Sequence, residues 1–314
     1  MNLYDDFQPD VPALLRDQDA KLPPPRADAR SGDGLGLGGR LASLVRLATL
    51  GAAVKTGLHR RLVYANVRLD WFHEFQDYWC NELANRPIHP YDFYYLAGVY
   101  RQRLQTIHFD QLEDPSRASD TKHLAAWRDP RLVYYLFAHT YRLALSPLRV
   151  HPYVRYVPRG GRVAEYGCGA APIVGALARH YRHLDLQLVG ADIPHLLFHY
   201  ARWKFRGAPF VTMVPIAADD DRPLPGRYDV MFCLETLEHV PRPLAVLQHL
   251  HDVLAPGGYL VFDYIRSEGK GLDTASALRD RIPALRFILE RFDVVQGRVA
   301  ADGGHVTPSV VRKR

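Results

Sequence analysis

After residue 150 the chain alternates between short apolar runs and stretches with helical spacing, and this alternation constrains the fold most strongly. Strand and helix in regular alternation are typical of a parallel sheet with helices on both faces. The last two runs, 293–300 and 305–314, have no helix between them, which predicts an antiparallel hairpin at one sheet edge. We expect an α/β, doubly wound, mostly parallel seven-stranded sheet with a helical N-terminal extension. The earlier apolar runs are 161–167, 185–193, 209–217, 228–235 and 257–265.

The first half of the chain has a different composition. Residues 1–40 include a stretch rich in Pro and Gly, which predicts a flexible segment and linker. Residues 41–150 are expected to form a helical region, and residues 151–314 the sheet domain. Within the helical region, Asp92 and Asp120 stand where N-caps are useful, and Pro147 is expected to end the last helix. Helical periodicity is strongest over 67–84, 91–109 and 120–145.

Charge and cysteine content bound the class of protein. The 314 residues carry a formal net charge of +6, but only six of the 40 basic residues are Lys, and the Arg residues are dispersed. Dispersed charge argues against a nucleic-acid surface. Three separated cysteines favour a reducing compartment, so we expect a cytoplasmic protein. The start of the chain does not resemble a secretory signal, and Arg46 and Lys55 interrupt the apolar stretch 41–58, so no membrane span is expected.

The first apolar run of the sheet domain ends in an acid followed by two glycines, in the sequence EYGCG. In a doubly wound sheet a ligand binds beyond the carboxyl ends of the strands, next to this kind of turn. Gly167 and Gly169 allow a sharp turn and leave no Cβ between the backbone and a ligand. Glu165 is expected to point its carboxylate toward the ligand, which would repel a pyrophosphate and attract a cation.

This turn resembles the first motif of class I S-adenosylmethionine-dependent methyltransferases, which has the form acid-x-Gly-x-Gly-x-Gly. Ala171 replaces the third glycine, which is acceptable where only close helix packing is needed. Asp192 closes the second run, where the resemblance implies a ribose contact. The sequences CLETLEHVPRP and LAPGGYLVFDY are similar to the family's stretch around the fourth and fifth strands. A dinucleotide-dependent oxidoreductase is the main rival, but it would have Gly where Pro172 stands.

The resemblance implies a Rossmann-like methyltransferase fold over residues 151–314, with S-adenosylmethionine as cofactor and residues 41–150 as a cap over the substrate. Glu165 and the turn would hold the methionine end, Asp192 the ribose and Asp219 the adenine amino group, with backbone contacts from Ala218. The cofactor-binding residues implied in this way are Glu165, Gly167, Cys168, Gly169, Asp192, Ile193, Ala218, Asp219, Leu234 and Glu235.

His239 is the candidate catalytic base, because it follows the fourth strand at the carboxyl edge of the sheet and imidazole suits a hydroxyl or amine acceptor. The alternative is that the Glu-His pair only braces the loop. Methyl transfer from a sulfonium needs no metal, so none is expected. A Mg²⁺ site remains an alternative, with Glu235, Glu238 and His239 on one side of a helical turn.

The expected acceptor is a small molecule, such as a natural product, sugar or other metabolite, methylated on oxygen or nitrogen. This follows from the aromatic side chains of the N-terminal region, which would form a partly apolar pocket. The polar loop 263–274, with Arg266 and Lys270, could meet an anionic acceptor. An RNA or protein methyltransferase with an Arg-rich surface and a non-catalytic binding module are the alternatives, and a homodimer is left open. The aromatic residues are Tyr91, Tyr94, Tyr95, Tyr100, Trp127, Tyr134 and Tyr135.

Overall fold

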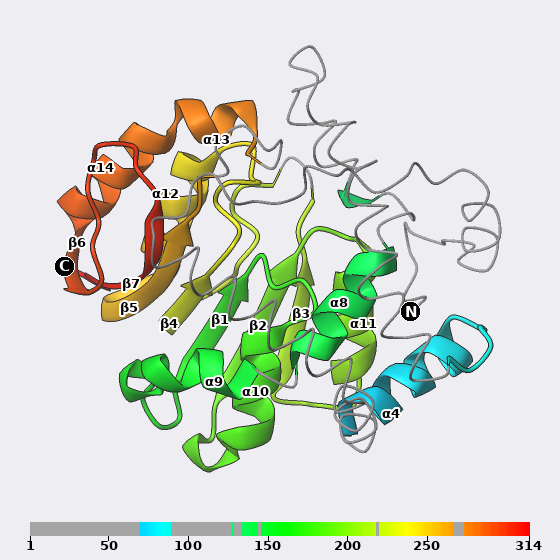
Figure 1. Cartoon of the computed structure of the whole chain (residues 1–314). Coiled ribbons are helices and arrows are strands. Elements are labelled where there is room, and N and C mark those ends of the chain that lie inside the picture. Colours follow the sequence, from blue (N-terminus) through cyan, green and yellow to red (C-terminus); the bar gives the residue numbers. More distant parts are fainter. Residues whose placement is uncertain (1–69, 89–126, 129–132, 144–145, 218–219, 267–272) are drawn as a thin grey trace, which may run out of the picture.

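The computed structural model describes residues 70–88, 127–128, 133–143, 146–217, 220–266 and 273–314. Their centre is a seven-stranded sheet with the order β3-β2-β1-β4-β5-β7-β6 (Figure 1). The strands β1 to β5 pair in parallel, and β7 pairs antiparallel with both β5 and β6. The predicted parallel sheet with an antiparallel hairpin at one edge is therefore confirmed. The strands are β1 (Arg162–Tyr166), β2 (Gln187–Asp192), β3 (Val211–Pro215), β4 (Tyr228–Cys233), β5 (Leu254–Tyr264), β6 (Phe292–Gln296) and β7 (Val306–Lys313).

Helices cover both faces of this sheet, because the strand residues alternate between two buried clusters. In β1, Val163 packs toward α10 (Pro172–His180) and α11 (Leu196–Phe205). Its neighbour Ala164 packs on the opposite face with α12 (Pro243–Val253) and α14 (Arg281–Arg291). Both neighbours are fully buried, as expected for a parallel strand inside a three-layer fold. The shorter elements of this domain are α9 (Ser146–Val150), η5 (His151–Tyr156), η6 (Arg182–Leu184) and α13 (Ala275–Arg279).

The described part of the N-terminal region packs against α11. It comprises α4 (Asp70–Asp77), the π-helical turn η1 (Tyr78–Glu82) and α8 (Val133–Leu143). Their aromatic rings form a third buried cluster with the outer side of α11, and Tyr78 stacks edge-on against Tyr200. This cluster fixes the N-terminal region beside the glycine turn of β1, because Ala170 also belongs to it.

The helix expected to end at Pro147 ends earlier, at Leu143, and Pro147 lies inside α9. Pro is well suited to the first turn of a helix, where its missing N–H is not needed. The helix expected over 91–109 and the caps at Asp92 and Asp120 lie outside the described residues.

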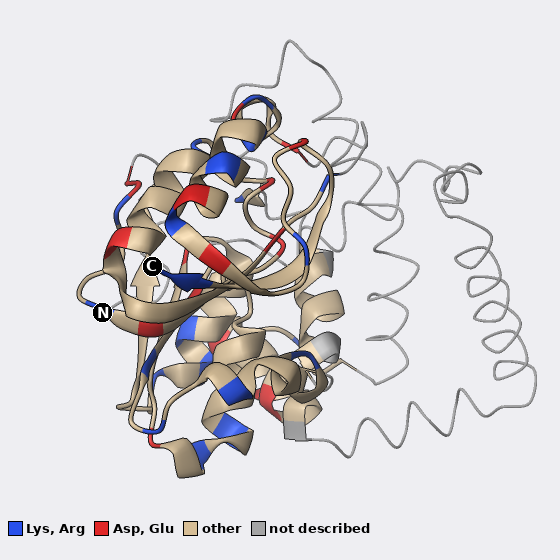
Figure 2. Ribbon diagram, turned by 90° about the vertical axis from the view of Figure 1, so that its left-hand side faces the viewer, with Lys and Arg blue, Asp and Glu red and all other residues tan. Residues whose placement is uncertain are grey.

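Charged residues are spread over both helical layers in Figure 2, with acidic residues among the basic ones. Within the described ranges, every helix is too short or too polar to span a lipid bilayer.

Arg281 ties the β6–β7 edge of the fold to the core. Its side chain is 3% exposed and donates hydrogen bonds to the carbonyl oxygens of Tyr264, Ile265 and Gly304. The guanidinium also lies over the Tyr264 ring. One cation therefore satisfies buried carbonyls at the end of β5 and in the loop before β7.

We expect Arg281→Met to lower the free energy of unfolding by about 2–4 kcal/mol, because it leaves these carbonyls without donors. Urea denaturation followed by circular dichroism measures the change. Arg279→Met is the matched control, since the Arg279 side chain is 71% exposed and pairs with the adjacent Asp280. Equal stability of the two variants would contradict the role assigned to Arg281.

Candidate active site

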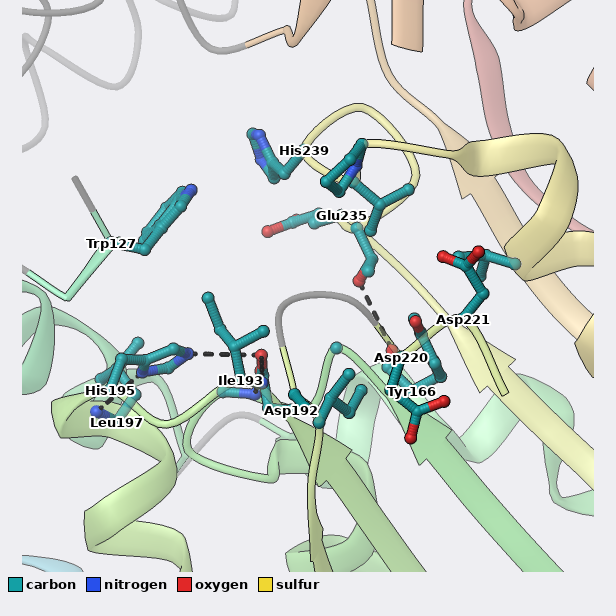
Figure 3. A pocket seen from close by; sticks show the side chains of 18 of the residues that line it. Trp127, Tyr166, Asp192, Ile193, His195, Leu197, Asp220, Asp221, Glu235 and His239 are labelled. Carbon is teal, nitrogen blue, oxygen red and sulfur yellow. Dashed lines mark hydrogen bonds and ion pairs between the residues drawn. The ribbon is translucent and has the colours of Figure 1, made fainter. Parts of the chain in front are cut away.

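A cavity of about 290 Å³ opens at the carboxyl ends of β1, β2 and β4 (Figure 3). One part of its wall comes from the turns that follow these strands, and another from the N-terminal region. The position agrees with the binding edge expected of a doubly wound sheet. The lining residues include Trp127, Tyr135, His139, Tyr166, Gly167, Gly169, Asp192, Ile193, His195, Leu197, Ile216, Ala217, Asp220, Asp221, Glu235, Thr236, His239 and Arg242.

The glycine turn after β1 forms one wall of the cavity with bare backbone. Gly167 has φ +69°, and a Cβ added there would lie 2.3 Å from the side chain of Thr236 in the loop after β4. The N–H groups of Gly167 and Cys168 both donate to the Ala191 carbonyl at the end of β2. Only glycine meets both demands at position 167, because the turn is left-handed and closely packed.

Ala171 also adopts a left-handed conformation, with φ 53°, at the start of α10. The expectation that this position requires only close packing is therefore incomplete. A glycine here would relieve backbone strain, which a non-glycine residue in this region carries.

Glu165 and Cys168 lie behind the turn and do not line the cavity. Glu165 is 6% exposed, and its carboxylate accepts hydrogen bonds from the backbone N–H groups of Ile173 and Val174, in the first turn of α10. Burial raises the pKa of Glu165 to about 8, although these two donors lower it. In the structure, this carboxylate is therefore bound by the N-terminus of α10. Its contact with a ligand stays a prediction.

Asp192 reaches the cavity from the end of β2, and its carboxylate has several donors around it. Oδ2 accepts from the N–H of Gly169 at 2.6 Å, and Oδ1 accepts from the N–H of Ile193 at 2.7 Å. The Nε2 atom of His195 lies 3.4 Å from Oδ1. The Asp192 side chain remains 14% exposed, on the cavity side.

The acidic run after β3 contributes two carboxylates that the sequence analysis did not select. Ala218 and Asp219, the residues predicted to contact adenine, lie outside the described residues. Asp220 and Asp221 line the cavity, and Asp221 pairs with Arg242 at 2.9 Å. The sequence offers no signal to decide which of the three consecutive acids, Asp219, Asp220 and Asp221, line the cavity.

The loop after β4 is shaped differently from the helical turn that was expected. Glu235 has φ 52°, its N–H donates to Asp263 Oδ1 at 2.7 Å, and its carboxylate pairs with Arg149 at 2.9 Å. Glu238 instead turns inward and is 2% exposed. Placing Glu235, Glu238 and His239 on one side of a helical turn was therefore wrong. Among the described residues, no three His, Cys, Asp or Glu side chains gather as a metal site would require.

His239 lines the cavity from this loop, and its ring meets the aromatic residues of the N-terminal region. Trp127 contacts His239 edge-on with ring centroids 5.3 Å apart, and Trp127 lies 5.4 Å from Tyr135. Tyr135 in turn contacts His139 at 5.8 Å. These four rings, which we call the aromatic wall, bring α8 and the β4 loop to the same cavity. Leu234, predicted near the cofactor, packs against the buried cluster that includes Val163.

The arrangement fits S-adenosylmethionine. Bare backbone at Gly167 and Gly169 permits close approach, Asp192 offers a carboxylate to hydroxyl donors, and Ile193 and Ile216 supply apolar surface for a base. The aromatic wall lies on the other side of the same cavity. An acceptor could lie between this wall and the cofactor.

Comparison with known proteins agrees with this geometry. The family model described as "Methyltransferase domain" matches residues 137–298, which is more than half of the chain. Curated relatives named "Ubiquinone biosynthesis O-methyltransferase" include one from Shewanella halifaxensis, 30% identical over 158 residues covering 48% of this chain and 63% of the relative. Another, from Azotobacter vinelandii, is 32% identical over 132 residues, covering 40% and 54% respectively. The chain thus spans about half to three fifths of these relatives.

Solved structures with similarity to the chain include the CurJ carbon methyltransferase, at 16% identity and a TM-score of 0.44, covering 73% of this chain and 72% of that one. The N-terminal domain of EvdMO1 with SAH bound is 20% identical with a TM-score of 0.37, covering 54% and 80%.

The chain belongs to the class I S-adenosylmethionine-dependent methyltransferases. S-adenosylmethionine is the cofactor of this family.

The buried Glu238 predicts a specific pH dependence of stability. Burial, together with the nearby Asp273 and Glu235, raises its pKa to about 8, although its own backbone N–H and Arg281 act in the opposite direction. Between about pH 4.5 and 8 the folded protein therefore keeps a proton that the unfolded chain has lost. Stability contributed by this group is present at low pH and is lost as the pH rises toward 8.

We expect Glu238→Gln to gain stability relative to the wild type between pH 5 and pH 8, by on the order of 1 kcal/mol, because Gln cannot ionise. Urea denaturation at both pH values measures the difference. Glu290→Gln, at an exposed position of α14, is the control and should follow the wild-type pH profile. A Glu238→Gln variant that also follows that profile would contradict the protonated state of Glu238.

Proposed function

We propose that this protein transfers a methyl group from S-adenosylmethionine to an oxygen atom of a small molecule. One observation carries the proposal: a single cavity has the glycine turn and Asp192 on one side and the aromatic wall with His239 on the other. The relatives named as O-methyltransferases of ubiquinone biosynthesis support oxygen as the acceptor atom.

Cofactor binding would be divided among the strand-end turns. Asp192 would accept hydrogen bonds from the ribose hydroxyls with the lone pairs that Gly169 and Ile193 do not use. Gly167 and Gly169 would admit the amino-acid part close to the backbone. Ile193 and Ile216 would flank the adenine, and Asp220 or the neighbouring Asp219 would accept from its amino group. Glu165 would not contact the cavity directly but would fix the start of α10 and the turn before it.

His239 would serve as the general base for a hydroxyl acceptor. When bound, the cofactor supplies a methyl group on a positively charged sulfur, which is open to in-line displacement. The imidazole of His239 would take the hydroxyl proton while the acceptor oxygen bonds to the methyl carbon, and the electron pair of the broken C–S bond stays on sulfur. Trp127, in edge contact with His239, would orient the ring and keep water away.

Isothermal titration of the full chain with S-adenosylhomocysteine tests the cofactor assignment. We expect binding by the wild type and at least ten-fold weaker binding by Asp192→Asn, because the amide loses the charge that strengthens bonds to hydroxyls. Asp185→Asn is the control, at an exposed position before β2. Absence of binding by the wild type, or equal binding by Asp192→Asn, would contradict the assignment.

Methyl transfer from labelled S-adenosylmethionine to a panel of phenols, catechols and sugars tests the acceptor class. With an acceptor found in this way, His239→Ala should lower kcat by about two orders of magnitude while the affinity for S-adenosylhomocysteine stays within two-fold. His183→Ala, exposed at the other end of the sheet, is the matched control. Unchanged kcat in His239→Ala would remove the base assignment, and transfer only to RNA or protein would overturn the small-molecule proposal.

A further inference from the structure

His195 occupies an unusual position between α11 and the cavity. It is the N-cap residue of α11, and its Nδ1 atom accepts from the N–H groups of Leu197 at 3.2 Å and Phe198 at 3.3 Å. Ser, Thr, Asp and Asn are the residues that usually accept these bonds. Here an imidazole nitrogen takes their place, in a side chain that is 7% exposed.

This cap decides where the ring carries its proton. An Nδ1 atom that accepts from two backbone donors must present its lone pair, so the proton of the neutral ring is on Nε2. Nε2 faces Asp192, 3.4 Å from Oδ1, as the dashed line in Figure 3 shows. The Nε2–H side of the ring therefore faces the carboxylate that lines the cavity, at a longer distance than the two backbone donors.

The other donors to Asp192 come from its own strand end and from the glycine turn. Gly169 approaches Oδ2, while Ile193 and His195 approach Oδ1. Both backbone donors lie in turns, and His195 is the side chain that connects the carboxylate to the first turn of a helix. α11 in turn packs on the N-terminal region through Leu197 and Tyr200.

We infer that His195 is a positioning residue for the cofactor: Nδ1 caps α11 while Nε2–H holds the Asp192 carboxylate in the orientation that receives the ribose. The inference rests on the proposed ribose contact of Asp192. It assigns the two ring nitrogens separate tasks, one for the stability of α11 and one for cofactor affinity.

The two tasks can be separated with a pair of amides. In His195→Asn the side-chain oxygen takes the place of Nδ1 and keeps the cap, but no donor reaches Asp192. In His195→Gln the longer amide places a donor near the position of Nε2 and loses the cap. We expect Asn to raise the Kd for S-adenosylhomocysteine about five-fold with little change in Tm. We expect Gln to lower Tm by roughly 2–5 °C with Kd within two-fold of the wild type.

Calorimetry and thermal unfolding of the full-length variants measure both effects, and Asp192→Asn completes a double-mutant cycle. If His195 acts through Asp192, His195→Asn should cause little further loss of affinity in the Asp192→Asn background. Equal losses in both backgrounds would mean that His195 contacts the ligand directly, which would overturn the inference. So would wild-type affinity in His195→Asn.

The imidazole tautomer provides a readout that does not depend on the cofactor. Nitrogen NMR of the histidine-labelled protein, with the signal assigned by its loss in His195→Asn, should show His195 protonated on Nε2 alone. Protonation on Nδ1 would contradict the inference. If the wild type does not bind S-adenosylhomocysteine while the tautomer is as expected, it is the proposed function that fails.

Discussion

The close packing of two strand-end turns is the constraint on which the cavity depends. β1 and β4 are neighbours in the sheet, so the turns that follow them must pass each other at the carboxyl edge. Gly167 and Thr236 make that contact, with room for a hydrogen atom but not for a methyl group. The strain at Glu235, a non-glycine residue with φ 52°, lies immediately before this contact. The cavity wall is consequently backbone, and its shape follows from the sheet order.

Several buried carboxyl groups surround this edge, and their environments explain how they are tolerated. Burial raises the pKa of Glu165 and Glu238 to about 8 and that of Asp263 to about 7. Backbone N–H groups at the start of α10 and at Glu235 offset part of the cost for Glu165 and Asp263. With pKa values near 8, Glu165 and Glu238 are mostly protonated at neutral pH, so they add little negative charge behind the cavity wall.

Much of the sheet could be predicted from sequence because β1, β2 and β4 are short apolar strands that are largely buried, and α10, α11 and α12 follow β1, β2 and β4 with clear periodicity. The site was harder to predict, because side-chain direction depends on contacts between distant segments. The position of Glu165 at a strand end predicts a contact with the ligand. In the structure its carboxylate accepts hydrogen bonds from the first turn of α10. The i, i+3, i+4 spacing that ends at His239 reads as a helix, but the positive φ of Glu235 breaks it. The cap at His195 had no sequence signal, since histidine is not among the common N-cap residues.

The residues that line the cavity lie partly inside and partly outside the range matched by the family model. The matched residues 137–298 include the glycine turn and Asp192, which are proposed to hold the cofactor, and also His239. Trp127 and Tyr135 lie before the matched region, yet they complete the aromatic wall through contacts with His239 and His139. Under the proposed function, the residues that hold the cofactor lie in the family-matched part of the chain, whereas the wall proposed to face an acceptor is partly built by residues outside it. Acceptor choice should therefore change with the N-terminal region while the cofactor site stays the same.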